Sequence, residues 1–152
     1  MRLIISGHRD EKLLNYDCHW ISTKITSLVR ILMNEKGVNL AYSGMASGVD
    51  LLFCKACEIH NLPFIACVPF DGQEKLMTEE AAIAREKYLK QASSIMKVKN
   101  SWMVEHADFA IVVFDGNKGG THNVFQQLIE KKIDFYWINP VSQVVWKCFK
   151  EA

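Results

Sequence analysis

Glycine, histidine, arginine and aspartate recur in four short polar segments of this chain, each placed directly after an apolar run. The segments are residues 7–10 (GHRD), 43–50 (SGMASGVD), 69–73 (PFDGQ) and 115–121 (DGNKGGT). Glycine lacks a Cβ, so the backbone N–H groups around it can approach phosphate oxygens closely. An arginine guanidinium binds the same oxygens through its planar fork of donors. The segments therefore predict binding of a phosphate-bearing ligand.

The residues expected to hold this ligand come from these segments and from the stretch around residue 100. They are Gly7, His8, Arg9, Ser43, Gly44, Ser47, Asp50, Pro69, Phe70, Lys99, Asn100, Asp115, Gly119, Gly120, Thr121 and His122. A neutral imidazole at His8 or His122 can hydrogen-bond a ribose or a base, or move a proton near neutral pH. His19, His60 and His106 fall on predicted helices or at their ends, where a structural role is the better interpretation.

Short apolar runs alternate with stretches of helical periodicity, and this alternation predicts an α/β fold. Strands are expected at residues 3–6, 38–42, 63–68, 94–98, 109–114 and 134–138. Helices are expected from about 21 to 36, at 49–60, 78–92 and 119–131, with a helical turn at 101–106 and a closing helix at 141–149. Such an order gives a Rossmann-like, doubly wound, mainly parallel sheet with helices on both faces. The carboxyl ends of its strands meet at one edge, so the four polar segments should converge there.

The composition limits the partners of this chain. Its 152 residues are expected to form one domain, residues 1–152, and its 18 basic and 17 acidic residues give a net charge of +1. That balance provides no long-range field for nucleic acid or anionic lipid, so phosphate binding must be local. No apolar run is long enough for a signal peptide or a membrane-spanning helix, which predicts a cytoplasmic protein.

The cysteines and the large apolar side chains are interpreted as core residues. The five cysteines are an odd, scattered set and are expected to be reduced, with Cys54 and Cys57 packed in the core. Met96, Trp102, Met103 and Trp146 are assigned to the core rather than to a ligand cage. Walker A, G-x-S-x-G and HExxH patterns are all absent, so neither a metal nor a cofactor is expected.

Taken together and in this order, the motifs resemble one family. They are residues 6–9 (SGHR), 43–50 (SGMASGVD), 69–75 (PFDGQEK) and 100–104 (NSWMV), followed by Asp115-Gly116 and Gly119-Gly120-Thr121. They look like the YpsA-like branch of the SLOG superfamily, which also contains the LOG phosphoribohydrolases and the DNA-processing protein DprA. The resemblance covers Met1 to Pro140. It implies a Rossmann-like fold that binds nucleotides or nucleotide-derived signals at these loops, and a homodimer, as is common in the LOG enzymes.

The chain departs from the LOG pattern at the positions that carry catalysis. LOG enzymes hydrolyse the N-glycosidic bond of nucleoside monophosphates, with an Arg before the penultimate strand and a Glu just after a Gly-Gly-x-Gly-Thr loop. The matching positions here hold Lys99 and residues 122–124 (HNV). A carboxylate is the group that stabilises an oxocarbenium-like centre or activates water. The pattern therefore favours binding without turnover, in which the chain senses or sequesters a nucleotide-derived molecule such as an ADP-ribose-like or cyclic nucleotide.

Two other hypotheses remain open. One is a phosphoribohydrolase in which Asp115, Asp50 or His122 replaces the missing Glu. The other is a partner-binding protein with a vestigial pocket, or a DprA-like binder of single strands, which is the weakest because no Lys/Arg stripe is present. A homodimer is expected to use apolar helix faces that include the region of Trp102 and Met103.

Overall fold

One sheet of seven strands forms the centre of the molecule in the computed structural model, which describes residues 1–150. Its strand order is β4-β3-β2-β1-β5-β6-β7. The strands are β1 (Arg2–Gly7), β2 (Leu40–Ser43), β3 (Phe64–Cys67), β4 (Ser94–Met96), β5 (Phe109–Val113), β6 (Asp134–Asn139) and β7 (Val144–Cys148). All neighbouring pairs are parallel except β6 and β7, which are antiparallel. The predicted Rossmann-like, mainly parallel sheet is confirmed.

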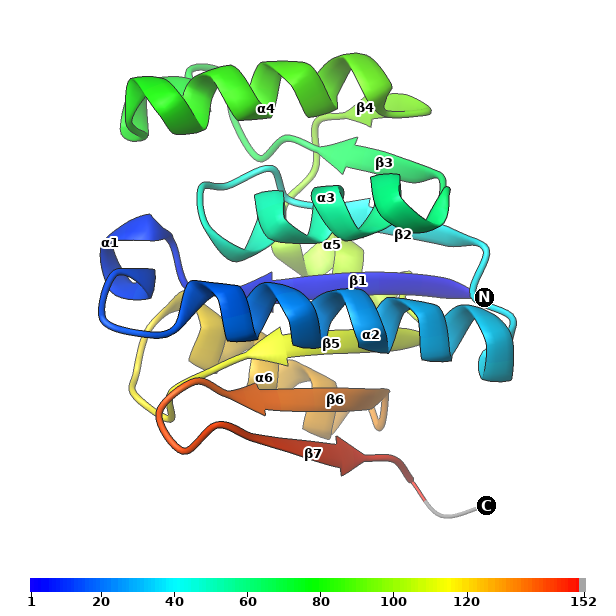
Figure 1. Ribbon diagram of the computed structural model, residues 1–152. Helices are drawn as coiled ribbons and strands as arrows, with labels where there is room; N and C mark the ends of the chain where they lie inside the picture. The colour runs from blue at the N-terminus through cyan, green and yellow to red at the C-terminus, as the bar shows by residue number, and fades with distance from the viewer. Residues whose placement is uncertain (151–152) are drawn as a thin grey trace.

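Helices cover both faces of the sheet, with α2 and α3 on one face and α5 and α6 on the other (Figure 1). The helices are α1 (Asp10–Leu13), α2 (Cys18–Lys36), α3 (Val49–His60), α4 (Glu79–Gln91), α5 (Asn100–Glu105) and α6 (Gly120–Glu130), with a 3₁₀ helix η1 (Gln73–Leu76). Side chains alternate along β1, so Leu3 and Ile5 join the core under α2 and α3, and Ile4 joins the core under α5 and α6.

The local signals that set the longest helix are present in the sequence. Asp17 caps α2 by accepting the N–H of Trp20, and Gly37 ends it in a left-handed conformation. Between them Ile21, Ile25 and other residues at helical spacing are fully buried. Burial of this apolar stripe fixes α2 against the sheet.

The chain reverses its direction of growth at the centre of the sheet. From β1 it proceeds outward to β4, and it then crosses to the other side of β1 to form β5 and β6. The loops that follow β1 and β5 therefore diverge at their carboxyl ends and leave a crevice between them. These ends lie on the left in Figure 1, beside α1.

The predicted closing helix at residues 141–149 is wrong. This segment contains strand β7, which pairs with β6 from Asn139↔Val144 to Phe135↔Cys148. Its sequence, VVWKC, is rich in the β-branched and aromatic residues that favour strands. The Asn139 side chain accepts the N–H groups of Val141 and Ser142, which builds the tight turn between the two strands.

The remaining differences from the sequence interpretation are small. Strand β2 begins at Leu40 rather than at residue 38, and the short helices α1 and η1 were not predicted. Within residues 1–150, none of the helices combines the length and the apolar character that crossing a membrane requires.

Candidate functional site

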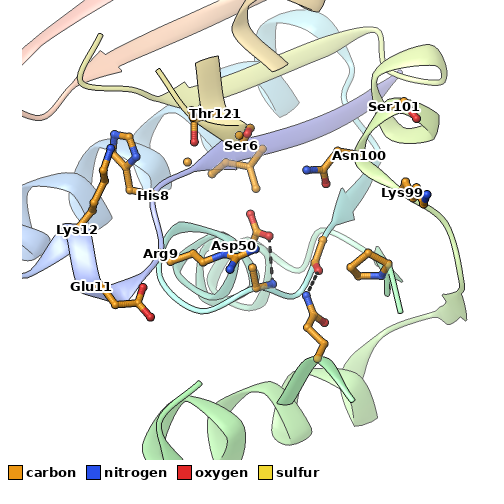
Figure 2. A pocket seen from close by; sticks show the side chains of 18 of the residues that line it. Ser6, His8, Arg9, Glu11, Lys12, Asp50, Lys99, Asn100, Ser101 and Thr121 are labelled. Atoms are coloured by element: carbon orange, nitrogen blue, oxygen red, sulfur yellow. Dashed lines mark hydrogen bonds between the residues drawn. The ribbon is translucent and has the colours of Figure 1, made fainter. Parts of the chain in front are cut away.

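A cavity of about 930 Å³ opens at the carboxyl ends of the parallel strands. Most of the predicted site residues line it: Gly7, His8, Arg9, Gly44, Asp50, Pro69, Phe70, Lys99, Asn100, Gly119, Gly120 and Thr121. Figure 2 shows that the labelled side chains come from a strand end, from loops and from helices on several sides of the cavity. A volume of this size is typical of a site for a small molecule or cofactor. Ser43, Ser47, Asp115 and His122 do not line this cavity.

The loops after β1 and β2 are packed directly against each other. A Cβ on Gly7 would come within 2.6 Å of the Val49 side chain, and a Cβ on Gly48 within 2.5 Å of the His8 carbonyl oxygen. The N–H of Val49 donates to that same oxygen over 3.1 Å. This close contact fixes Arg9, which follows β1, beside the first turn of α3, where Asp50 lies (Figure 2).

Three backbone donors of the β2–α3 loop are used within the protein. The N–H of Met45 donates to Ser43 Oγ (3.3 Å), and the N–H of Ala46 donates to Asp50 Oδ2 (3.1 Å). The Val49 N–H donates to the His8 carbonyl. The sequence analysis expected this glycine segment to help bind phosphate, but three of its donors are satisfied by acceptors within the protein.

The N-terminus of α6 has donors that are not used in this way. Its first backbone bond is from Asn123 N–H to the Gly119 carbonyl, and no side chain caps it. Within residues 1–150 the N–H groups of Gly120, Thr121 and His122 therefore have no acceptor. The first turn carries no acidic residue, and no atom lies within 4 Å of a Cβ built on Gly120. These donors and the positive end of the helix dipole suit an anion.

Cations surround the cavity. Arg9, Lys12, Lys99 and Lys118 line it, against the carboxyl groups of Glu11 and Asp50. Lys12 lies 3.6 Å from Asp115, whereas Arg9 is exposed and forms no ion pair within 4 Å in the described part of the chain. The Arg9 guanidinium is therefore available to a ligand.

Asp50 is a carboxyl group held in the cavity wall. Its Oδ2 accepts the Ala46 N–H, and its Oδ1 has no hydrogen-bond donor among residues 1–150. Burial raises the pKa of Asp50 to about 7, although the Ala46 N–H and the Arg9 charge both act to lower it. Near neutral pH this carboxyl is therefore divided between its protonated and ionised forms.

His8 and Asp115 form a buried network that fixes the loop after β5. His8 is 6% exposed, and its Nε2 accepts the Asp115 N–H over 3.1 Å. That bond requires a neutral ring, and burial lowers the pKa of His8 more than the Asp115 carboxylate raises it. The Asp115 side chain accepts the Tyr16 hydroxyl (2.9 Å) and the Asn117 N–H (2.9 Å). Both residues thus position the β5–α6 loop.

The same network explains the charge of Asp115. Burial acts to raise the pKa of this carboxyl, but the Asn117 N–H, the Tyr16 hydroxyl and the charge of Lys12 hold it below its ordinary value. Its side chain is 2% exposed. Asp115 is therefore a sequestered carboxylate that makes turn contacts, with its side chain buried outside the cavity.

The other predicted residues outside the cavity have local roles. Ser43 is fully buried and donates to the Asp50 carbonyl (3.2 Å). Ser47 Oγ accepts the N–H of Asp10 (3.4 Å). His122 lies on α6 against the ring of Phe114 (5.8 Å between centroids).

Several cavity residues were not among the site residues expected from the sequence, although six of them lie in the segments named there. They are Ile5, Ser6, Glu11, Lys12, Ala46, Gln73, Ser101, Asn117 and Lys118. Gln73 is the most informative of them. Its Nε2 donates to the Gly44 carbonyl (2.9 Å), and its Oε1 accepts Arg85 Nε (3.2 Å). The loop after β3 is thereby joined to the loop after β2. The neighbouring residues of this loop had been singled out, but a lone glutamine gave no further signal.

The expectations for core residues are mostly confirmed. Cys54 and Cys57 are buried free thiols, and Met103 is buried in the core. Side-chain nitrogens of His60 and His106 hydrogen-bond backbone carbonyls. Two expectations are wrong, because Trp146 is 52% exposed on the edge strand and His19 is exposed without a hydrogen bond within residues 1–150.

Comparison of the chain with protein-family models and with curated proteins finds no match. The fold and the site define its class: a Rossmann-like α/β protein with a cavity at the switch point of a mainly parallel sheet.

Proposed function

We propose that this chain binds a nucleotide-derived small molecule, such as an ADP-ribose-like or cyclic nucleotide, and that it senses or sequesters this ligand. In this proposal the chain is a cytoplasmic protein without a bound cofactor. The observation that carries the proposal is the uncapped N-terminus of α6, which opens into the 930 Å³ cavity with no acidic residue in its first turn.

The arrangement of the cavity assigns a place to each part of such a ligand. The phosphate would accept the N–H groups at the start of α6, with the unpaired Arg9 guanidinium as a counter-charge. Pro69 and Phe70 line the cavity from the loop after β3, and Phe70 is 42% exposed there. An exposed aromatic ring at a cavity rim is suited to stacking against a base.

The resemblance to the YpsA-like branch of the SLOG superfamily belongs to the same proposal. The motifs on which it rests lie in the loops after β1, β2, β3 and β5 and at the start of α5, and each of these segments contributes residues to the cavity. That common location supports the resemblance.

Calorimetric titration with the four ribonucleoside 5′-monophosphates and ADP-ribose tests the proposed function. Binding of at least one of these probes with a dissociation constant below about 100 μM would support it. Absence of heat from every probe at millimolar concentration would contradict it.

The competing function is an N-glycosidic hydrolase, and one observation favours it: Asp50 brings a carboxyl group into the cavity. The other two candidate replacements for the missing Glu lie outside the cavity. Asp50, however, follows β2, whereas the glutamate of LOG enzymes follows the loop at the start of the phosphate-binding helix. We therefore retain binding as the leading function.

We expect little or no release of base from adenosine monophosphate. Cleavage needs a carboxylate at the anomeric carbon, and the position next to the α6 loop offers His122, Asn123 and Val124 instead. A chromatographic assay measures the outcome. Base release near 1 per second, the low end of ordinary enzyme turnover, that disappears in Asp50→Asn would establish the hydrolase.

We also propose that the chain forms a homodimer. Met103 is buried within the protomer and contributes no contact surface, but Trp102 remains partly exposed on α5. We expect a dimer in light scattering at micromolar concentration. A single species of 17.4 kDa would rule it out.

A further inference from the structure

We propose that Asp50 recognises the 2′,3′-diol of the ligand, so that, of the two ligand types in the proposed function, this cavity selects ADP-ribose-like nucleotides with both hydroxyls free and disfavours 3′,5′-cyclic nucleotides, as it does deoxynucleotides. This inference rests on the proposed function, and it narrows the class of ligand.

The hydrogen bonds of Asp50 leave one oxygen for the ligand. Oδ2 is fixed by the Ala46 N–H at 3.1 Å, and Oδ1 lacks a donor from the described residues. Asp50 lines the cavity, and in Figure 2 its carboxyl group points into the open space between Arg9 and Asn100. A fixed carboxyl group with an unused oxygen that lines a cavity can accept a donor from the ligand.

The chemistry of the carboxylate limits what that donor can be. An ionised carboxylate has only acceptor sites, and so does a fully ionised phosphate, which makes direct contact between the two unfavourable. With the phosphate at the start of α6, the nearest donors of a nucleotide are the hydroxyl groups of its sugar. A carboxylate that binds ribose hydroxyls is the arrangement used in dinucleotide-binding sheets of this architecture.

Gly44 lies closely packed between Asp50 and Asn100. A Cβ at this position would lie 2.9 Å from Asp50 Oδ2 and 3.5 Å from Asn100 Oδ1. Asn100, at the start of α5, therefore lies near Asp50, and its amide supplies both donors and an acceptor. Both residues line the cavity, so a diol bound in the cavity beside them has a partner for each hydroxyl.

The groups around Asp50 favour an ionised carboxylate once a donor is present. Its charged or titratable neighbours are Arg9, the Cys54 thiol on α3 and the Cys67 thiol at the end of β3. Burial raises the pKa of both thiols to about 12, so they stay neutral, and Arg9 provides the only charge among these three. A hydroxyl that donates to the ionised carboxylate replaces part of the hydration lost on burial.

The test compares each ribonucleoside 5′-monophosphate with its 2′-deoxy counterpart and with the 3′,5′-cyclic form by calorimetry at pH 8. Wild type is compared with Asp50→Asn, in which the Asn carbonyl can still accept the Ala46 N–H and keep the loop folded. The control is Asp71→Asn. Asp71 lies on the loop after β3, and its exposed carboxylate pairs with Lys97.

In wild type and in Asp71→Asn we expect the ribonucleotide to bind at least tenfold more tightly than the deoxy and cyclic forms, the effect of about one hydrogen bond to a charged group. In Asp50→Asn this ratio should fall to near one. Equal affinities for ribo and deoxy forms in wild type would overturn the inference and leave the proposed function intact. Failure of every nucleotide to bind would overturn both.

Discussion

Replacing Gly120 by Asp is expected to abolish ligand binding, with a loss of at least about 100-fold in affinity, and to leave the fold intact. The new carboxylate would occupy the space in which a phosphate accepts the N–H groups of α6. It would satisfy those donors itself and repel the anion.

The same geometry explains why this variant should fold. No atom lies within 4 Å of a Cβ at Gly120, so the side chain extends into the cavity. An acidic residue in the first turn of a helix is stabilising, by about 0.3–1 kcal/mol. The melting temperature should therefore be unchanged or slightly raised.

Gly120→Ala is the matched control, since it adds the Cβ without the charge. It should weaken binding far less than the Asp variant does. Calorimetry with the tightest nucleotide probe measures both. A folded Gly120→Asp protein that binds the probe as wild type does would move the phosphate away from α6.

Asp50→Asn is expected to raise the free energy of unfolding at pH 8 by about 2–4 kcal/mol. The folded-state pKa of Asp50 is raised to about 7 from the ordinary 3.8. Below pH 4 the carboxyl is protonated in both states and has no effect on stability. Between pH 4 and pH 7 only the unfolded state releases the proton, so stability falls as pH rises, and above pH 7 the full cost remains.

The Asn variant carries no ionisable group at this position, so the stability difference from wild type should be small at pH 4 and complete by pH 8. Urea denaturation at pH 4, 6 and 8 measures it. Asp71→Asn, at an exposed site, should show no such pH-dependent gain. A wild-type protein as stable as Asp50→Asn at pH 8 would mean that the carboxylate is fully solvated.

Apolar periodicity predicted most of the helices and strands because it follows burial, and glycine placement indicated where helices end. Helix α2 follows from its apolar stripe and from Gly37, and β5 from its five buried residues. Strand β7 was missed because the apolar run at residues 141–149 is too short to distinguish a helix from a strand by periodicity. The turn before β7 is built by the Asn139 side chain and contains no glycine that would have marked it in the sequence.

The candidate site was predictable as a set of loops but not as a set of side chains. Strand ends in a parallel sheet must converge, which places Arg9, Asp50 and Gly120 together. Sequence does not tell which way a side chain turns at a strand end, so Asp115 was assigned to the ligand although it binds Tyr16 and Asn117.

The difference between the glycine segments at residues 43–50 and 115–121 likewise depends on the folded structure. Both have the composition of a phosphate cradle, and only the hydrogen bonds reveal that the N–H groups of Met45, Ala46 and Val49 are satisfied within the protein. Asp50 accepts the Ala46 N–H, and it is also the group that we assign to sugar recognition.

The most direct measurement is mass spectrometry of the small molecules released from purified wild-type protein and from Gly120→Asp. We expect a phosphate-bearing ribonucleotide derivative to be released from the wild type and to be absent from the variant. A released molecule without a phosphate group, or the same molecule in equal amount from both proteins, would contradict nucleotide binding at the N-terminus of α6.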